Sequence, residues 1–291
     1  MVLLVGSALA GVIVGLLSGL LGIGGGTIMV PLFRLAFGMP AIQATATSLF
    51  AIIPTSLSGC AGHIRNRTCV AGVGLAAGLA GACLSPLGVN LANMSPSWAI
   101  MLAAAAIIGY SAFTMLKKGL ALPKGKGKER PKASAANGAA GAGAAGEPAK
   151  AAASATRPVR VRVRATRHQM AVGAAAGAVA GLASGYVGVG GGFLMVPLFI
   201  QFGGISMKQA SGTSLIAVTM LAIPGAIAQI MLGNVHVVAG LALALGSIPG
   251  ALLGANLVKY VSERNLRLLF GGFLMVVAVI LIANEIMVPE V

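Results

Sequence analysis

Long apolar stretches dominate the chain, and their length is the first structural signal. The segments 98–116 and 268–284 contain no charged side chain. Each approaches the roughly 20 apolar residues that a helix needs to cross a bilayer. The pattern therefore predicts an all-α polytopic membrane protein.

The apolar pattern divides into ten helical segments, five in each half of the chain. In each half, a first segment stops at a run of glycines and resumes after it, and three longer helices follow. We expect the helices at 3–21, 27–37, 41–61, 68–91 and 96–116, and at 168–187, 193–202, 207–232, 235–260 and 264–286. This predicts a membrane repeat over 1–116, a linker over 117–167 and a second membrane repeat over 168–291.

The two halves are copies of one unit. A shift of 166 residues aligns GLLSGLLGIGGGTIMVPLF (15–33) with GLASGYVGVGGGFLMVPLF (181–199), and 13 of these 19 positions are identical. Without a gap, the same shift aligns QATATSL (43–49) with QASGTSL (209–215). Because one offset holds through separate motifs, we interpret the halves as structural repeats.

The charged loops distinguish two topologies. If each glycine segment were one full span, the halves would be parallel, and the loop 259–267 would face the side opposite to the linker. If each glycine segment is a hairpin, the halves are inverted, and Arg65, Arg67, the linker and that loop all face the cytoplasm. Both termini then lie outside, and Arg34 is the one misplaced basic residue. We therefore predict two inverted-topology repeats, each a glycine-tipped helical hairpin plus three transmembrane helices.

The formal net charge of +15 is concentrated in the linker. Thirteen of the 20 basic residues fall between 117 and 167, opposed only by Glu129 and Glu147. The linker is rich in Ala, Gly, Pro and Lys and poor in aromatic residues, which predicts a flexible cytoplasmic segment. We expect its partner to be anionic lipid headgroups. Nucleic acid is disfavoured because aromatic stacking groups are missing.

The glycine runs predict an anion-binding site. A helix broken at membrane depth leaves N–H groups that lipid cannot satisfy, and in transporters such half-helix ends face anionic groups. Gln, Thr and Ser side chains on the next helix would add uncharged hydrogen-bond donors. The predicted substrate-binding residues are Gly24, Gly25, Gly26, Thr27, Gln43, Thr47, Ser48, Gly190, Gly191, Gly192, Phe193, Gln209, Thr213 and Ser214.

Structural roles are the alternative for several of these residue types. Ser and Thr also bond backbone carbonyls or neighbouring helices, so both interpretations stay open for the hydroxyl residues. Small residues in membrane helices also permit close packing. That packing role is the preferred interpretation for the glycines spaced four residues apart, Gly15, Gly19, Gly181 and Gly185.

Ionisable and reactive side chains are scarce in the predicted spans. His63 and His236 fall at predicted helix ends, where we expect interfacial positions. Cys60, Cys69 and Cys83 have no counterparts 166 residues later, which favours small apolar packing over thiol chemistry. We expect no catalytic residue, no bound metal and no cofactor. A neutral site needs no coupling ion for anion export, because an inside-negative potential favours exit.

The motifs GIGGGTIMVPLF and GVGGGFLMVPLF, followed by ATATSL and ASGTSL, resemble the TauE/SafE family of sulfite and organosulfonate exporters. The resemblance covers both membrane halves and leaves out the linker. It implies a bacterial inner-membrane transporter, not an enzyme, that exports sulfite, sulfoacetate or related sulfonates from a site between the repeats. A channel-like conduit for small anions would use the same neutral lining and is the alternative.

Overall fold

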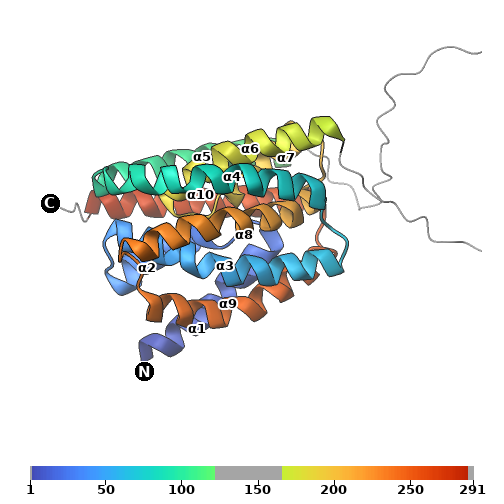
Figure 1. Cartoon of the computed structure of the whole chain (residues 1–291). Coiled ribbons are helices and arrows are strands. Elements are labelled where there is room, and N and C mark those ends of the chain that lie inside the picture. Colours follow the sequence, from blue (N-terminus) through green and yellow to red (C-terminus); the bar gives the residue numbers. More distant parts are fainter. Residues whose placement is uncertain (1, 122–165, 288–291) are drawn as a thin grey trace, which may run out of the picture. The chain divides into compact units, whose positions relative to one another are not determined.

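The structure, a computed structural model, describes residues 2–121 and 166–287, with side chains over 9–121 and 166–283. Within these ranges every regular element is a helix, and there is no strand (Figure 1). The expected all-α class is therefore confirmed. The helices are α1 (Val2–Leu21), α2 (Gly26–Phe37), α3 (Ala41–Arg65), α4 (Ala71–Asn93), α5 (Ser97–Leu120), α6 (Arg167–Val187), α7 (Gly192–Gln201), α8 (Met207–Met231), α9 (Val237–Leu257) and α10 (Glu263–Met287).

Helix ends differ from the expected ones mainly where basic residues follow an apolar run. α3 continues through Arg65, and α5 continues through Lys117 and Lys118 to Leu120. Cations in a last helical turn interact favourably with the helix dipole, which explains these extensions. The structure describes only the two ends of the predicted linker, where α5 reaches Leu120 and α6 begins at Arg167. Residues 122–165 lie outside the described residues.

Among the described residues, seven helices are long and apolar enough to cross a membrane: α3, α4, α5, α6, α8, α9 and the 263–283 part of α10. α2 and α7, which follow the glycine runs, have only 12 and 10 residues. At 1.5 Å per residue neither reaches across the roughly 30 Å hydrocarbon core. The chain is a multi-pass membrane protein, as expected.

Glycines let each helix before a break lie very close to a helix of the other half. A methyl group on Gly15 of α1 would lie 2.1 Å from the Ser247 carbonyl oxygen of α9. A methyl group on Gly185 of α6 would lie 2.0 Å from the Ser85 carbonyl oxygen of α4. Gly19 and Gly181 make equally close approaches. The packing role predicted for these four glycines is confirmed, because any side chain would push the helices apart.

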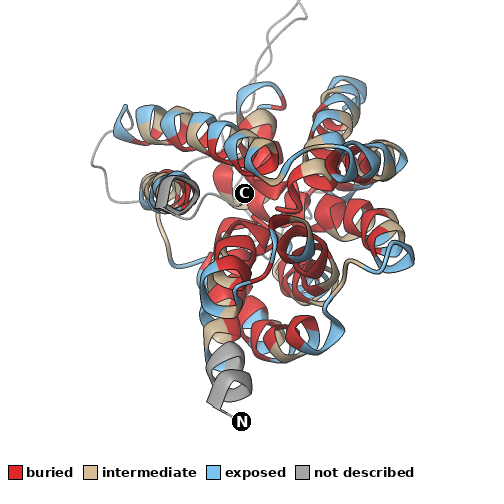
Figure 2. Cartoon of the chain, turned by 90° about the vertical axis from the view of Figure 1, so that its left-hand side faces the viewer, coloured by how far each residue is buried: buried red, intermediate tan, exposed pale blue. Residues whose placement is uncertain are grey.

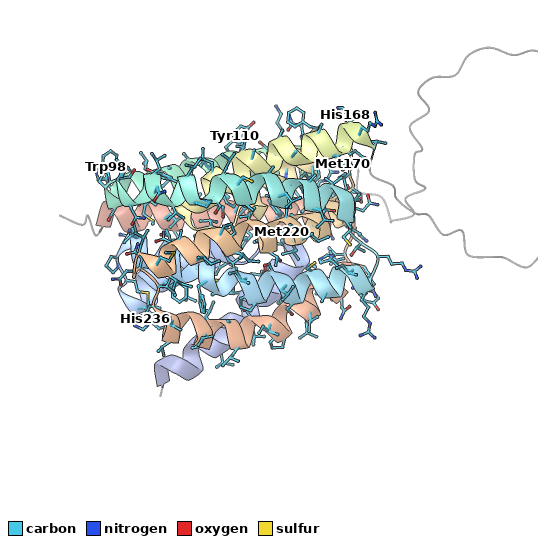
Figure 3. All side chains as sticks on the ribbon, viewed as in Figure 1. Trp98, Tyr110, His168, Met170, Met220 and His236 are labelled. Carbon is cyan, nitrogen blue, oxygen red and sulfur yellow. The ribbon has the colours of Figure 1, made fainter. Side chains whose placement is uncertain are left out.

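Buried residues gather along the middle of the bundle, while exposed residues lie on the outward faces of its helices (Figure 2). Many outward side chains are large and apolar, for example Leu79 and Val276, at 59% and 58% exposure. Such surfaces suit hydrocarbon. Trp98 and His236 lie at one end of the bundle, and His168 and Met170 lie at the other (Figure 3).

Candidate anion site at the two glycine turns

Both helix breaks are turns that require glycine. Non-glycine residues rarely adopt a positive φ, because their Cβ atom collides with the backbone. Each break has three residues with φ between 67° and 89°. These six residues are all glycines: Gly22, Gly24, Gly25, Gly188, Gly190 and Gly191. The conformation therefore explains the glycine runs better than packing alone.

The second break turns the chain back toward the end of the bundle from which it came. Gln169 Nε2, in the first turn of α6, donates a hydrogen bond to the Gly203 carbonyl oxygen, just beyond α7, at 3.1 Å. The start of α6 and the end of α7 are therefore neighbours. In the first half, α2 likewise returns toward the end where α1 begins (Figure 1).

The two turns touch each other, backbone to backbone, in the interior. A methyl group on Gly26 would lie 2.5 Å from the Val189 carbonyl oxygen. A methyl group on Gly192 would lie 2.5 Å from the Gly22 carbonyl oxygen. Both values are shorter than real Cβ contacts. Segments 166 residues apart in the chain thus meet at one place.

One apolar side chain from each half covers both turns. Ile52 of α3 and Val218 of α8 are separated by the same 166 positions, and both are fully buried. A methyl group on Gly24 would lie 2.7 Å from Val218 Cγ1, and one on Gly190 would lie 2.9 Å from Ile52 Cδ1. All residues from 22 to 27 and from 188 to 193 are buried. The turns are therefore closed to both ends of the bundle.

The serines of the second shared motif bond the turns of the opposite half. Ser48 Oγ donates to the Gly188 carbonyl oxygen. Ser214 Oγ donates to the Gly22 carbonyl oxygen at 2.7 Å. These carbonyl groups lie at the C-terminal ends of α6 and α1, where no N–H group of a following helical turn is available to them. In this structure the two serine hydroxyls therefore bond backbone carbonyls, which is the structural role that the sequence left open for them.

The neighbouring threonines also hold the opposite half through its backbone. Thr47 Oγ1 accepts a hydrogen bond from the His236 N–H group at 3.0 Å. Thr213 Oγ1 accepts one from the Val70 N–H group at 2.9 Å. Like the serine bonds, these two are related by the 166-residue offset.

The two predicted glutamines lie in the first turns of their helices, away from the buried turns. Gln43 is exposed, and Gln209 is half-buried. Gln209 completes a capping box, in which its Oε1 accepts from the Ser206 N–H group at 3.4 Å and its own N–H group donates to Ser206 Oγ at 3.4 Å. The structure therefore does not bring the glutamines to the glycine turns, and their substrate role stays a prediction.

Three buried hydroxyls beside the turns have no hydrogen-bond partner among the described residues. They belong to Ser18, Ser184 and Thr27, each fully buried. Ser18 and Ser184 occupy matching positions in α1 and α6, and Thr27 lies in the first turn of α2. The serine pair was absent from the predicted site, although both serines fall inside the aligned motifs GLLSG and GLASG.

The electrostatics of the turns favour negative charge. α2 and α7 begin at the turns, and their N-cap residues, Gly25 and Gly191, offer no side chain to the first N–H groups. The N-terminal end of each helix carries a partial positive charge. Two such ends with nearby hydroxyl donors form a place where an oxyanion could be bound without a fixed charge.

Buried ionisable side chains lie beyond the turns. Arg34, in the last turn of α2, is 7% exposed, and the dipole of that turn favours a cation. His63 lies in the last turn of α3, at a helix end as expected, but its side chain is fully buried against protein. His63 Nε2 lies 2.8 Å from the Gly19 carbonyl oxygen, and Nδ1 lies 2.7 Å from Thr68 Oγ1. His236 is exposed, as expected for an interfacial residue.

The cysteines take three different environments and form no disulfide. Cys60 is buried against Leu215 and Ile216, which agrees with the predicted packing role. Cys69 is half-buried and Cys83 is exposed. Within the described ranges, no group of three His, Cys, Asp or Glu side chains is arranged to hold a metal ion.

The spanning helices define a multi-pass membrane protein, and helix breaks buried within such a bundle are typical of membrane transporters. Residues 7–281 match the family described as "Sulfite exporter TauE/SafE", so the chain belongs to this family. It is 26% identical over 256 residues to the probable membrane transporter protein YdhB of Bacillus subtilis, covering 88% of this chain and 90% of YdhB.

Two other similarities cover less of the chain. A probable membrane transporter protein of Xylella fastidiosa is 30% identical over 115 residues, or 39% of this chain and 44% of that protein. The probable membrane transporter protein MamO of Magnetospirillum gryphiswaldense is 32% identical over 107 residues, or 34% and 17% of the two chains. No solved structure matches this chain.

Proposed function

We propose that this protein exports small sulfur-containing anions, such as sulfite, sulfoacetate or related sulfonates, from a site at the two glycine turns. One observation carries the proposal: two helix N-termini meet in a buried place, beside hydroxyl groups that have no hydrogen-bond partner among the described residues. Oxyanions suit that combination of donors. The sulfur chemistry comes from the description of the family.

The proposed architecture consists of two inverted repeats. Its support is the exchange of equivalent bonds between the halves: the Ser48 hydroxyl holds the Gly188 carbonyl, and the Ser214 hydroxyl holds the Gly22 carbonyl. α3 and α8 also run in opposite directions between the two ends of the bundle (Figure 1). Rocking of such halves about a shared site is a common means of alternating access.

The proposed orientation places the end of the bundle near His168 in the cytoplasm of a bacterial cell. Asn66 Nδ2 donates to the Ala255 carbonyl oxygen at 3.0 Å, which joins the α3–α4 loop to the end of α9. Figure 1 shows the start of α6 at this same end of the bundle, so the basic residues of these loops agree with the positive-inside rule. The linker would then be cytoplasmic and close to anionic lipid headgroups, with both termini outside.

A carrier fits the closed turns better than an open conduit. Ile52 and Val218 cover the turns from two helices, and the surrounding residues are buried. A carrier must open this place to one side at a time. Outward movement of one negative charge gains about 2.3 kcal/mol per 100 mV of inside-negative potential, so no coupling ion is required.

Flux in proteoliposomes tests the proposal. We expect saturable sulfite or sulfoacetate flux with counterflow, which a channel-like conduit does not give. Combined Ser18→Ala and Ser184→Ala should reduce kcat/KM about tenfold, corresponding to about 1.4 kcal/mol of lost stabilisation. Ser111→Ala is the matched control, because Ser111 is also a buried hydroxyl without a described partner but lies on α5.

Ligand-dependent melting supplies a second measurement on the purified protein. We expect sulfite or a sulfonate to raise the melting temperature, and we compare thiosulfate, sulfate and small carboxylates at equal concentrations. If none of them stabilises the protein and the double serine variant transports normally, the anion site at the turns is wrong. Gln43→Ala and Gln209→Ala, measured alongside, test the predicted glutamines separately.

A further inference from the structure

An apolar groove opens on the outward side of α6 and α7. It encloses about 260 Å³, and every side chain that lines it is apolar. The lining residues are Val172, Ala175, Ala176, Val179, Leu198 and Phe202. Ala176, at 5% exposure, lies at its base, while Val179 and Phe202, at 58% and 55% exposure, form raised sides. Its position along a membrane-spanning helix places the groove beside lipid chains.

Basic side chains, the cations Lys118 and Arg167 together with His168, lie at one end of this groove. Lys118 Nζ donates to Gln201 Oε1 at 2.9 Å, and Gln201 directly precedes Phe202 of the groove. Arg167 and His168 are exposed at the start of α6, one helical turn before the groove begins. Figure 3 shows His168 at this end of the bundle. An anionic group lying at the groove end would thus meet positive charge from both α5 and α6.

The one carboxylate that the structure describes is already bonded elsewhere, so it does not neutralise these cations. Glu263 is the one acidic residue whose side chain the structure describes. It accepts from Arg267 and from the Met207 N–H group, which it holds at 3.1 Å. The groove end is therefore a locally basic surface at the membrane boundary.

The first half lacks this arrangement, which makes the groove a feature of one repeat. At the 166-residue offset, Asn284 and Val2 replace Lys118 and His168, and Ala36 replaces Phe202. The repeated fold alone therefore does not account for the cations. Lys118 ends the first half, on α5, and Arg167 and His168 begin α6 of the second half, so these basic side chains come from both sides of the linker.

We infer that the groove binds one acyl chain of a phospholipid, whose anionic headgroup is held by Lys118, Arg167 and His168. The apolar lining suits hydrocarbon, and the cations at its end suit a phosphate-containing headgroup without a compensating ammonium group. The cytoplasmic leaflet, on the side proposed for this end, supplies anionic lipids. Long basic side chains at helix ends reach the headgroup level readily.

Lipid titration of the delipidated full chain in neutral detergent tests the inference. We use phosphatidylglycerol and phosphatidylcholine with identical acyl chains, and we measure bound lipid by native mass spectrometry and the melting temperature. We expect phosphatidylglycerol to bind at least about tenfold more tightly (a difference of about 1.4 kcal/mol). Equal affinity for the two lipids would overturn the inference.

Charge variants locate the headgroup. The triple variant Lys118→Gln, Arg167→Gln and His168→Asn should lose the preference for the anionic lipid. The double variant Arg65→Gln and Arg67→Gln changes charge at the same end but on elements that do not line the groove, and it should retain the preference. A triple variant that still prefers phosphatidylglycerol contradicts the assignment.

A groove-filling variant tests the acyl-chain position without altering charge. Ala175→Leu should weaken both lipids several-fold, whereas Ala171→Leu, exposed on the same helix but outside the lining, should weaken neither. Unchanged lipid binding by Ala175→Leu would exclude the groove. A change in oligomeric mass without a change in bound lipid would instead show that a second copy occupies it. These readouts need no transport, so they are independent of the proposed export.

Discussion

The two glycine turns share a backbone but differ in the side chains around them. Both turns use three glycines with positive φ, and each is held by a serine of the other half. At the second helical position after the turn, however, the first half has Thr27 and the second has Phe193, both fully buried. The common features are those that the fold requires, and the differences mark where the halves can serve different roles.

A second difference lies one helix further on. His63 and Gln229 occupy matching positions, and both are fully buried. His63 bonds Thr68 and the Gly19 carbonyl, whereas Gln229 Oε1 accepts from Asn234 at 2.8 Å, and its Nε2 has no partner among the described residues. The polar contact to the following loop is kept in both halves. The contact to the helix before the break, which is α1 in the first half, is made only by the histidine.

The largest expected effect comes from breaking the contact between the turns. Gly26→Ala and Gly192→Ala each place a methyl group against a backbone carbonyl that cannot move away cheaply. We expect each to destabilise the protein by about 2–4 kcal/mol and to abolish transport. The measurements are melting temperature in detergent and flux in proteoliposomes. Gly272→Ala, with open space around it, is the control and should have no adverse effect.

Removing the bonds that each half makes to the other should give a smaller, symmetric loss. Ser48→Ala and Ser214→Ala leave the Gly188 and Gly22 carbonyls unsatisfied, at a cost of about 1–2 kcal/mol each. Comparable shifts in melting temperature would support equivalent roles in two related halves. A loss confined to one variant would show that the repeats are not energetically equivalent. Thr114→Ala, which removes only a bond within α5, is the control.

The Thr27 and Phe193 difference should appear in transport rather than in stability. Thr27→Val removes the hydroxyl and keeps the shape, so the melting temperature should change little. If this hydroxyl helps to bind the anion, kcat/KM should fall about tenfold, or about 1.4 kcal/mol. Normal flux from Thr27→Val would leave the helix ends and the paired serines as the only donors in the proposed site.

The smallest effect is expected when one half receives the residue of the other. His63→Gln should preserve the bond to Thr68 and cost less than about 1 kcal/mol, because glutamine already occupies the matching place in the second half. His63→Leu should cost more, since it leaves the Gly19 carbonyl and the Thr68 hydroxyl without this partner. Equal melting temperatures for the two variants would contradict the proposed bonding role.

Much of the fold could be predicted because its signals are local or repeated. Apolar length predicts the spanning helices, and the 166-residue offset predicts matching elements in the two halves. The glycine runs predict the breaks, because only glycine adopts three positive φ values so close together without strain. The burial of His63 was not predicted, because its position near a helix end indicates the interface unless neighbouring helices are known to cover it.

The candidate site was predicted only in part, for a related reason. Thr47, Ser48, Thr213 and Ser214 are polar residues in both halves, and sequence does not show whether their hydroxyls face a ligand or a carbonyl. The structure shows that they bond the backbone of the opposite half. Ser18 and Ser184, which are buried without a hydrogen-bond partner among the described residues, could not be predicted as site residues, because helix-packing motifs commonly contain serine.

The sequence by itself determined the helical membrane class, the repeat, the two breaks and the basic linker. Hydrophobicity, charge and glycine conformation are local properties, and the repeat is found by aligning two segments of the same sequence. Only the tertiary structure decided that the breaks meet, because contact between Gly26 and Val189 depends on how helices from two halves pack. It also decided which hydroxyls are already bonded and which remain available beside two helix N-termini. That distinction depends on the position of carbonyls far away in the chain.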